Sequence, residues 1–270
     1  MKIFYFIAVN YRNYEFTIKY IKSINRFNFD RANIHIRIVD NDSGPEDLEA
    51  IQKATTGLKN FKLIKNEKNL GYFKALNVGI DDVYDKRDCI LIVGNNDMEF
   101  HENFIAELQK VGYDDKTLVI APNIITMDGR HQNPHYIARM SRLRKFGFKV
   151  YHTSYFLSLC IHWLRGMQKK LRPPKKNDEH TKRQFIHMGV GACYILTEFF
   201  FDHYAKLDDS VFLWGEESLL ANQIESVNGK ILYEPDLIVY HRENGSVSKI
   251  PSRTAYKIAK ESYKTFSKYL

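Results

Sequence analysis

The chain has 270 residues, of which 44% are apolar, 14% aromatic and 27% charged. This length suits one large domain with a well-buried core or two small ones, and 14 Gly and 7 Pro are too few for a disordered or fibrous protein. The 40 Lys and Arg outnumber the 32 Asp and Glu, so the net charge is +8. Such an excess indicates an anionic partner: nucleic acid, a membrane surface or a phosphate-bearing substrate.

The first half of the chain alternates the patterns of strands and helices. Short apolar and β-branched runs predict buried strands at Ile3–Val9, Ile34–Val39, Phe61–Ile64, Cys89–Val93 and Leu118–Ile120. Apolar residues at helical spacing, or a Pro in the first turn, predict helices at Tyr14–Phe27, from Pro45 onward and at Gly71–Ile80. Strands alternating with helices predict an α/β fold with a doubly wound, mostly parallel sheet.

The positive charge is concentrated in one insert, Gly129–Asn177, which interrupts this alternation. The insert holds twelve Lys and Arg and no Asp or Glu, which leaves 28 bases against 32 acids, a net charge of −4, in the rest of the chain. A general nucleic-acid binder more often spreads its bases over the main domain. Beyond the insert, the patterns predict strands at Gly189–Leu196 and Ile231–Tyr233, and helices at Glu217–Val227 and Tyr256–Leu270.

The insert also carries one apolar stripe at helical spacing, formed by Phe156, Cys160, Trp163, Leu164, Met167 and Leu171. The run Val150–Leu164 is uncharged, but its 15 residues are short for a membrane span. An amphipathic segment flanked by bases is typical of a helix that lies in a membrane interface. The alternative is that the stripe packs on the catalytic domain or on a second subunit, as in a homodimer.

Polar residues follow several predicted strands. They include Asn10–Asn13, Asp40–Ser43 and Gly94–Asp97. In open α/β sheets, ligands bind beyond the carboxyl ends of the strands, so these loops are expected to meet around a ligand. Each loop alone is equally typical of turns and helix caps. Several of them converging at one sheet edge favour a binding site.

Seven segments carry a family resemblance in order along the chain: NYRN, IVDNDS, NLGYFKALNVGI, LIVGNNDMEF, GVGACYILT, FLWGEESLL and VYHRENGS. With the opening strand, this pattern resembles the inverting family 2 glycosyltransferases, which have a GT-A fold. Within that family, the DN-x-S element and the basic insert are most similar to rhamnosyltransferase-like enzymes of bacterial surface polysaccharides. The resemblance covers nearly the whole chain.

The resemblance implies a site for a nucleotide-sugar donor, for example a UDP- or dTDP-sugar. It places the nucleotide against Val9, Tyr11, Asp40, Asn41, Gly71, Lys74 and Asn96. Tyr11 can stack on the base, and the amide of Asn41 can pair with its imide edge. Lys74 can face a phosphate, although a solvated helix face is an equally good interpretation of this residue.

A divalent cation, Mg²⁺ or Mn²⁺, is the usual way to neutralise a leaving diphosphate. The family holds it in a D-x-D-like element, which here is Asn95-Asn96-Asp97. Asp97 is therefore the expected metal ligand, and His241 in the VYH-x-x-x-GS ending is expected to meet the metal or the diphosphate. Because Asn95 replaces a carboxylate, we expect weaker metal binding, and metal independence stays open. Asp97 can also simply cap a turn.

The acidic pair Glu216-Glu217 corresponds to the family's acidic pair beside the acceptor, and Glu217 matches the member that is usually the base. A carboxylate that is partly buried beside a like charge has a raised pKa, which suits a base. The same pair at a helix N-terminus also suits the helix dipole. Trp214 can stack on an acceptor sugar or belong to the core, and Arg242 can contact a phosphate near the acceptor.

The resemblance therefore implies one GT-A domain in three parts: residues 1–128 bind the nucleotide sugar, 129–177 form the basic amphipathic insert, and 178–270 hold the acceptor and catalytic groups. We expect an inverting hexosyl- or rhamnosyltransferase that acts on a saccharide linked to a polyprenyl diphosphate in capsule, O-antigen or other surface polysaccharide synthesis. Without a signal peptide and with three widely spaced Cys, it is expected in the cytoplasm, peripheral on the inner face of the cell membrane.

Three alternatives remain. A nucleotidyltransferase usually carries a Gly-rich phosphate loop, which NYRN lacks. A non-catalytic subunit that binds nucleotide sugars is favoured by Asn95. A nucleic-acid binder would use the insert, but the sequence contains no motif of that kind, and we expect no nucleic-acid partner.

Overall fold

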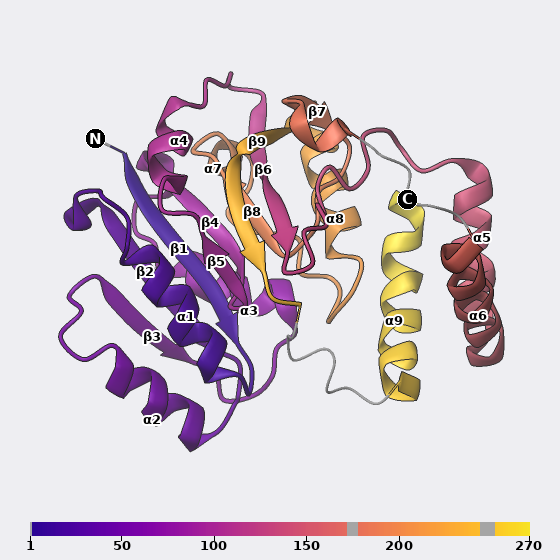
Figure 1. The fold of residues 1–270 in the computed structure, drawn as a ribbon, viewed down its shortest axis with the longest axis horizontal. Helices are drawn as coiled ribbons and strands as arrows, with labels where there is room; N and C mark the ends of the chain where they lie inside the picture. Colours follow the sequence, from indigo (N-terminus) through magenta and orange to yellow (C-terminus); the bar gives the residue numbers. More distant parts are fainter. Residues whose placement is uncertain (1, 172–177, 244–251) are drawn as a thin grey trace.

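The computed structural model describes residues 2–171, 178–243 and 252–270, which form a nine-stranded mixed sheet with helices on both faces (Figure 1). The strand order is β3-β2-β1-β4-β8-β6-β9-β5, and β7 also pairs with β9. The strands are β1 (Ile3–Asn10), β2 (Ile34–Asp40), β3 (Phe61–Lys65), β4 (Cys89–Asn95), β5 (Met98–Phe100), β6 (Thr117–Thr126), β7 (Gln184–Ile186), β8 (Cys193–Leu196) and β9 (Lys230–His241).

The amino-terminal half of the sheet is parallel. Strands β3, β2, β1 and β4 pair in parallel, and β8 then joins antiparallel between β4 and β6. The helices that connect the parallel strands are α1 (Tyr14–Ile24), α2 (Pro45–Ala54) and α3 (Tyr72–Asp81). Pro45 occupies the first turn of α2. Backbone N–H groups in the first turn make no hydrogen bond within the helix, so the absence of an N–H in Pro costs no such bond. The predicted α/β class is confirmed.

Helices cover both faces of the sheet because successive side chains of each buried strand point to opposite faces. Phe4 and Phe6 of β1 pack with α1 and α4 (Phe104–Lys110) on one face. Ile7 belongs to the core cluster on the other face, which also contains residues of α3, α7 (Phe200–His203) and α8 (Glu216–Ser226). This arrangement leaves the carboxyl ends of β1, β2 and β4 uncovered, with their loops side by side.

The predicted strands differ from the observed ones in the second half of the chain. Strands β5 and β7 were not expected, because three residues are too short to show a period. Strand β9 has twelve residues and passes through Pro235, where its register against β6 shifts. The strand expected at Gly189–Leu196 is only β8, since residues 189–192 form a loop beside α8.

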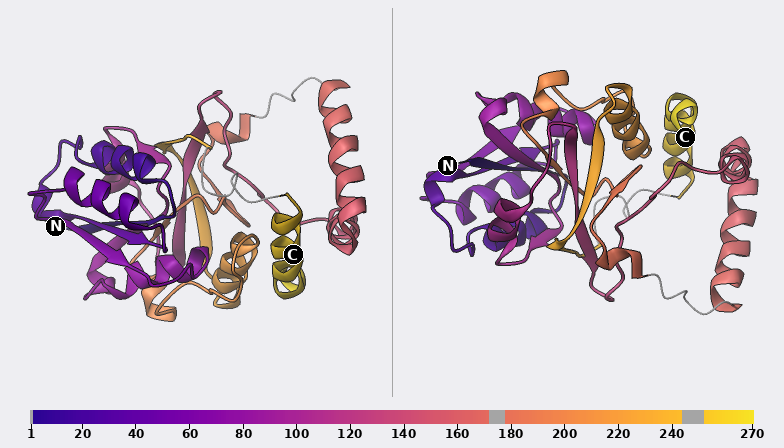
Figure 2. Two further views of the ribbon diagram at one scale, coloured as in Figure 1. Left: turned by 90° about the horizontal axis from the view of Figure 1, so that it is seen from below. Right: turned by 90° about the horizontal axis from the view of Figure 1, so that it is seen from above.

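The insert begins as part of the sheet domain. Residues 129–140 contain no helix, and bridges join Ile125 to His131 and Tyr136 to Met188. The insert helices are α5 (Arg142–Thr153) and α6 (Tyr155–Leu171), and the carboxyl-terminal helix is α9 (Ser252–Phe266). Both views of Figure 2 place α9 between the sheet domain and the insert helices.

Aromatic side chains connect these helices. His152 of α5 stacks on Tyr263 of α9 at 4.1 Å between ring centroids, and Phe266 packs with Leu219 of α8. The large apolar side chains on the outer surface of the insert helices are exposed: Leu143, Phe146, Phe156, Leu159, Trp163 and Leu164. The stripe therefore does not pack on its own sheet domain over its described length, which excludes the side chains of Met167 and Leu171. None of the described helices is long and apolar enough to cross a membrane.

Candidate active site

A cavity of about 320 Å³ lies at the carboxyl ends of β1 and β4. Ten of the thirteen residues expected in the site line it: Val9, Tyr11, Asn41, Gly71, Asn96, Asp97, Trp214, Glu216, Glu217 and His241. They come from six separate parts of the chain, and the fold brings them together as the strand order of the sheet predicts. We call this space the donor cavity.

Three expected residues do not line the donor cavity. Asp40 is fully buried beneath it, where its carboxylate accepts hydrogen bonds from the Asn10 side chain at 2.8 Å and from the backbone of Ser43 at 3.1 Å. Lys74 is exposed on α3, which agrees with the interpretation as a solvated helix face. Arg242 is paired with Glu99 of β5. Asp40 therefore shapes the loop after β2, and Arg242 attaches the end of β9 to β5.

The Asn41 side chain is fully occupied within the protein. Its Nδ2 donates to Oδ1 of Asn69 at 2.9 Å and to the carbonyl of Gly71 at 3.1 Å. Its Oδ1 accepts from Nδ2 of Asn66 at 3.1 Å and from the backbone of Leu70 at 3.0 Å. An amide has two donor hydrogens and two acceptor lone pairs, and all four are used. Asn41 holds the 66–71 loop and has nothing left to pair with a base, which corrects its expected role.

The side-chain amide of Asn96 is likewise held by hydrogen bonds within the protein. Its Nδ2 lies 3.1 Å from Oδ1 of Asn10, 2.8 Å from the hydroxyl of Thr17 and 3.2 Å from the carbonyl of Asn13. Asn10 itself is completely buried and donates to Asp40 and Asp47. This buried network orients the turn that presents Asp97 to the cavity.

Gly71 is required for a close approach within the protein. Its φ of +90° lies in the left-handed region, and a Cβ there would lie 2.3 Å from the carbonyl oxygen of Phe212. The neighbouring Tyr72 donates its backbone N–H to the same carbonyl at 3.0 Å. This close approach joins α3 to the loop before α8 and so closes one wall of the donor cavity.

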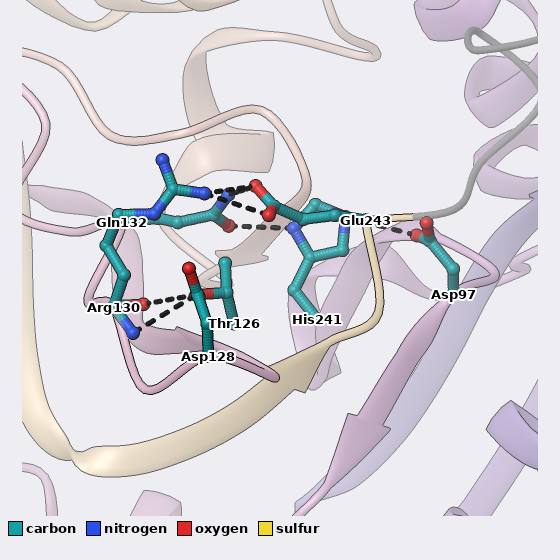
Figure 3. Close-up of polar contacts among 7 residues, drawn as sticks. All are labelled: Asp97, Thr126, Asp128, Arg130, Gln132, His241 and Glu243. Carbon is teal, nitrogen blue, oxygen red and sulfur yellow. Dashed lines mark hydrogen bonds and ion pairs between the residues drawn. The ribbon is translucent and has the colours of Figure 1, made fainter.

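The side chains of Asp97 and His241, which both line the donor cavity, face each other (Figure 3). Oδ1 of Asp97 is buried without a hydrogen-bond partner and lies 3.4 Å from Nε2 of His241. Nδ1 of His241 lies 2.7 Å from Oε1 of Gln132, an atom that only accepts, so Nδ1 carries a hydrogen and donates it. In neutral His241, Nε2 then carries no hydrogen, and its lone pair faces a carboxylate oxygen of Asp97. These two acceptors have no hydrogen to share, and a cation or a proton between them would satisfy both.

These residues fit a divalent cation. A carboxylate oxygen without a partner and an imidazole lone pair are both metal ligands, and hard cations often complete their shell with substrate phosphates. Among the described residues, no group of three or more His, Cys, Asp and Glu side chains could hold a metal ion by itself. A cation at Asp97 and His241 would therefore need further oxygen ligands from a bound molecule.

The acidic pair Glu216-Glu217 begins α8. One of its carboxylates is buried and the other is half-buried. Glu216 is 4% exposed, and its Oε1 has no hydrogen-bond partner. Burial, and then the charge of Glu217, raises the pKa of Glu216 to about 8. Glu217 is half-buried and accepts a hydrogen bond from the backbone N–H of Gly191 at 3.2 Å. A raised pKa, as expected for this acidic pair, is thus found at Glu216.

A second cavity of about 520 Å³ lies on the other side of Glu217, between the insert helices, α9 and the start of α8. Trp214 and Glu217 line both cavities. We call this second space the insert cavity. Its wall is mainly apolar and aromatic and includes His135, Tyr136, Phe148, Tyr151, Leu159, Met188, Tyr256, Phe266 and Leu270.

The residue between the two cavities is held in a strained conformation. Trp214 has φ +66°, in the left-handed region, which costs a residue with a side chain about 1–2 kcal/mol. The next residue, Gly215, lies against the ring of Phe266, and the hydroxyl of Ser262 donates to the carbonyl of Leu213 at 2.7 Å. Helix α9 thus supports the loop that places Trp214 and Glu217, and strain of this kind is common at binding sites.

Comparisons with known proteins identify the family of this chain. Residues 5–203 match the family described as glycosyl transferase family 2. The match covers well over half of the chain, so the chain belongs to glycosyl transferase family 2. No curated protein matches the sequence.

Solved structures similar to this chain share its fold. They include GalNAc-T7 with UDP, GalNAc and Mn²⁺ (TM-score 0.63, 15% identity, 100% of this chain and 50% of that chain). A mannosyltransferase from Pyrobaculum calidifontis with GDP-Man and Mn²⁺ has a TM-score of 0.60 at 11% identity, over 98% of this chain and 64% of that one. S. aureus TarS 1–349 has a TM-score of 0.58 at 12% identity, over 98% and 72%. The chain thus spans half of the first structure and less than two thirds of the second, and the expected GT-A fold is confirmed.

Several residues that shape the site were not expected from the sequence. Asn69 and Tyr72 line the donor cavity, and the backbone N–H of Gly191 donates to the carboxylate of Glu217. Asn69 and Tyr72 stand within a motif already noted, so their polar side chains were a usable signal. Gln132 carries no sequence signal, because its contact with His241 joins residues 109 positions apart.

Proposed function

We propose that the protein is an inverting glycosyltransferase that transfers a sugar from a nucleotide-diphosphate sugar to an acceptor hydroxyl. The observation that carries this proposal is the arrangement around the donor cavity. A buried, unpartnered carboxylate oxygen of Asp97 faces His241 on one side, and Glu217 stands in the wall shared with a second cavity. One side suits a diphosphate with its cation, and the other suits an acceptor beside a base.

In the proposed reaction, the acceptor hydroxyl enters from the insert cavity and its oxygen attacks the anomeric carbon of the donor sugar. The new bond forms as the bond from that carbon to the diphosphate oxygen breaks, so the configuration inverts. Glu217 takes the hydroxyl proton, and the diphosphate leaves with the bonding electrons. The backbone N–H of Gly191 holds the Glu217 carboxylate in position, and such placement of a base is a large part of catalysis.

The donor would lie with its base against Val9 and Tyr11, and with its diphosphate towards Asp97 and His241. A divalent cation, when bound by these two residues and the diphosphate, would neutralise the charge that develops on the leaving group. The two structural neighbours crystallised with Mn²⁺ and a nucleotide or nucleotide sugar support this part of the proposal. We infer UDP- or dTDP-linked donors, with a hexose or rhamnose as the transferred sugar.

The acceptor would be a saccharide carried on a lipid diphosphate, as in the synthesis of capsule, O-antigen or other surface polysaccharides. The mainly apolar wall of the insert cavity supports this inference. Leu159 lines the cavity and is also exposed on the outer surface, beside the exposed Trp163 and Leu164. Exposed bases of α5, such as Arg142 and Lys149, share this part of the protein. We propose that the insert helices lie on the inner face of the cytoplasmic membrane.

Transfer of label from a panel of UDP-, dTDP- and GDP-sugars to lipid-diphosphate saccharides, with and without Mn²⁺, tests the proposed function. Glu217→Gln should reduce turnover by about 100- to 10,000-fold, the usual contribution of a general base, with unchanged binding of the donor in a thermal-shift assay. Retained turnover would remove Glu217 as the base. Donor binding without turnover on any acceptor by the wild-type protein would favour the non-catalytic subunit, the alternative that Asn95 in place of a carboxylate suggests.

A further inference from the structure

We propose that Gln132 is a positioning residue that fixes the tautomer of His241, so that Nε2 presents its lone pair to the cation site at Asp97. This inference rests on the proposed function for the cation itself. It concerns a residue that touches neither the donor cavity nor Asp97, and that acts only through the imidazole ring.

The orientation of the Gln132 amide follows from its second partner. Its nitrogen lies 2.9 Å from Oε1 of Glu243, and an ionised carboxylate only accepts hydrogen bonds. The amide nitrogen must therefore face Glu243, and the amide oxygen must face Nδ1 of His241 at 2.7 Å. Glu243 is held in turn by Arg130, whose Nη2 lies 2.8 Å from each of its oxygens (Figure 3). The chain of contacts allows only one tautomer of neutral His241.

The local fold places Gln132 at His241 through a short hairpin after β6. The backbone of Thr126 at the end of β6 pairs with that of Arg130, and the N–H of Gln132 donates to the carbonyl of Ile124 at 2.8 Å. Arg130 and Gln132 are two residues apart in this extended segment, so their side chains share one side. Because β6 and β9 are parallel with Thr126 opposite His241, that side faces the end of β9.

The other tautomer would close the cation site. With the hydrogen on Nε2, the ring would donate towards Oδ1 of Asp97, 3.4 Å away, and satisfy the oxygen that now has no partner. A cation would then have to displace that hydrogen before either residue could bind it. A second partner that holds the remote ring nitrogen of a metal-binding His typically contributes roughly 10- to 100-fold to metal affinity.

Three variants of the full chain separate this role from a structural one. Gln132→Leu removes the acceptor for Nδ1. The double variant Gln132→Glu with Glu243→Gln exchanges the two groups, so that an acceptor still faces Nδ1 and the total charge is unchanged. Gln223→Leu is the matched control, because this half-buried Gln also uses both ends of its amide, at 2.9 and 3.0 Å, but at the far end of α8.

The measurements are Mn²⁺ affinity by electron paramagnetic resonance with UDP present, and the His241 tautomer by ¹⁵N NMR of the metal-free protein, assigned with His241→Gln. Gln132→Leu should weaken Mn²⁺ binding roughly 10- to 100-fold. In this variant, the ¹⁵N NMR spectrum should no longer show the His241 tautomer with its hydrogen on Nδ1. The exchange variant and Gln223→Leu should keep both properties of the wild type.

Unchanged tautomer in Gln132→Leu overturns the proposal, and so does a loss of Mn²⁺ affinity in Gln223→Leu equal to that in Gln132→Leu. If the wild-type protein does not bind Mn²⁺, the proposed cation site fails. The NMR result then decides the role of Gln132 alone: a tautomer that changes in Gln132→Leu and is kept in the exchange variant supports it, and any other result overturns it.

Discussion

Gly191 and Glu217 are in direct contact: the backbone N–H of Gly191 donates to the carboxylate of Glu217 at 3.2 Å, and there is no space between them for a side chain. A Cβ on Gly191 would lie 2.9 Å from Oε1 and 3.2 Å from Cδ of Glu217. The proposed base is therefore placed by a loop residue that must lack a side chain. The carbonyl of the same glycine accepts from the hydroxyl of Tyr72 at 2.7 Å, which anchors the loop to α3.

Gly191→Ala should lower kcat because the new methyl group displaces the Glu217 carboxylate. A displacement of about 1 Å at a catalytic group can cost on the order of 100-fold in rate. The backbone of Gly191 is not in the left-handed region, so the fold should tolerate Ala. Steady-state kinetics with the identified donor measures the effect. Gly112→Ala is the control, since a Cβ there meets nothing within 4 Å, and an equal loss in both variants would contradict the prediction.

Glu216→Gln should change how stability depends on pH. In the folded protein, burial and the neighbouring charge of Glu217 raise the pKa of Glu216 from the usual 4.5 to about 8. Between these two values the folded state binds more protons than the unfolded state, so the wild type loses stability as pH rises through this range. Gln is neutral at every pH, so the variant does not lose stability in this way. Its free energy of unfolding should exceed that of the wild type by a few kcal/mol near pH 8, and the difference between the two proteins should be smallest near pH 4.5.

Urea unfolding of both proteins at several pH values across this range measures the difference. Parallel stability curves for wild type and Glu216→Gln would show that Glu216 is ionised in the folded protein at neutral pH. The comparison is made without metal and donor, so that no ligand binding contributes to the measured stability.

Asp97→Asn should separate metal binding from folding. The carboxylate oxygen that is lost has no hydrogen-bond partner in the protein, so the metal-free variant should be at least as stable as the wild type. Mn²⁺ with UDP should raise the Tm of the wild type through binding to the folded state and leave the Tm of the variant unchanged. A Tm rise of the same size in Asp97→Asn would place the cation elsewhere.

Asn41→Ala should destabilise the loop that carries Asn69 and Gly71. The substitution leaves the carbonyl of Gly71 and the N–H of Leu70 without their partner, and each buried polar group left in this way costs about 1–3 kcal/mol. We expect a lower Tm together with a higher KM for the donor. A changed preference among nucleotides at unchanged Tm would instead restore the base-pairing role for Asn41.

The membrane proposal predicts the effect of removing exposed aromatic side chains from α6. Phe156 and Trp163 are 72% and 66% exposed, and replacing both with Ser should reduce co-sedimentation with vesicles that contain anionic lipid. Tyr84→Ser is the control, because Tyr84 is fully exposed but lies before β4 on the sheet domain. Unchanged sedimentation, with a smaller particle in light scattering, would assign the stripe to a homodimer.

Local patterns predicted most of the sheet and much of the site. Strands β1 and β4 are mainly apolar runs, β2 alternates β-branched and polar residues, and each of the three ends in a polar residue, so these strands and the loops after them were recognisable. Strands of three residues were missed, because a period cannot be read from β5 or β7. The site prediction succeeded where position at a strand end decides exposure. Asp40 and Arg242 do not line the cavity, and Lys74 is exposed on α3, in agreement with the alternative of a solvated helix face.

By itself, the amino-acid sequence determined the α/β class, the edge of the sheet at which polar loops meet, and the concentration of positive charge in one segment, because periodicity, turn residues and charge are local properties. Only the tertiary structure decided that Asn41 is saturated, that Glu216 and not Glu217 is the deeply buried member of the pair, and that Gln132 faces His241. These outcomes depend on hydrogen bonds and packing between residues far apart in the chain. Such contacts leave no period in the sequence, and they form only when the strands, helices and loops are assembled.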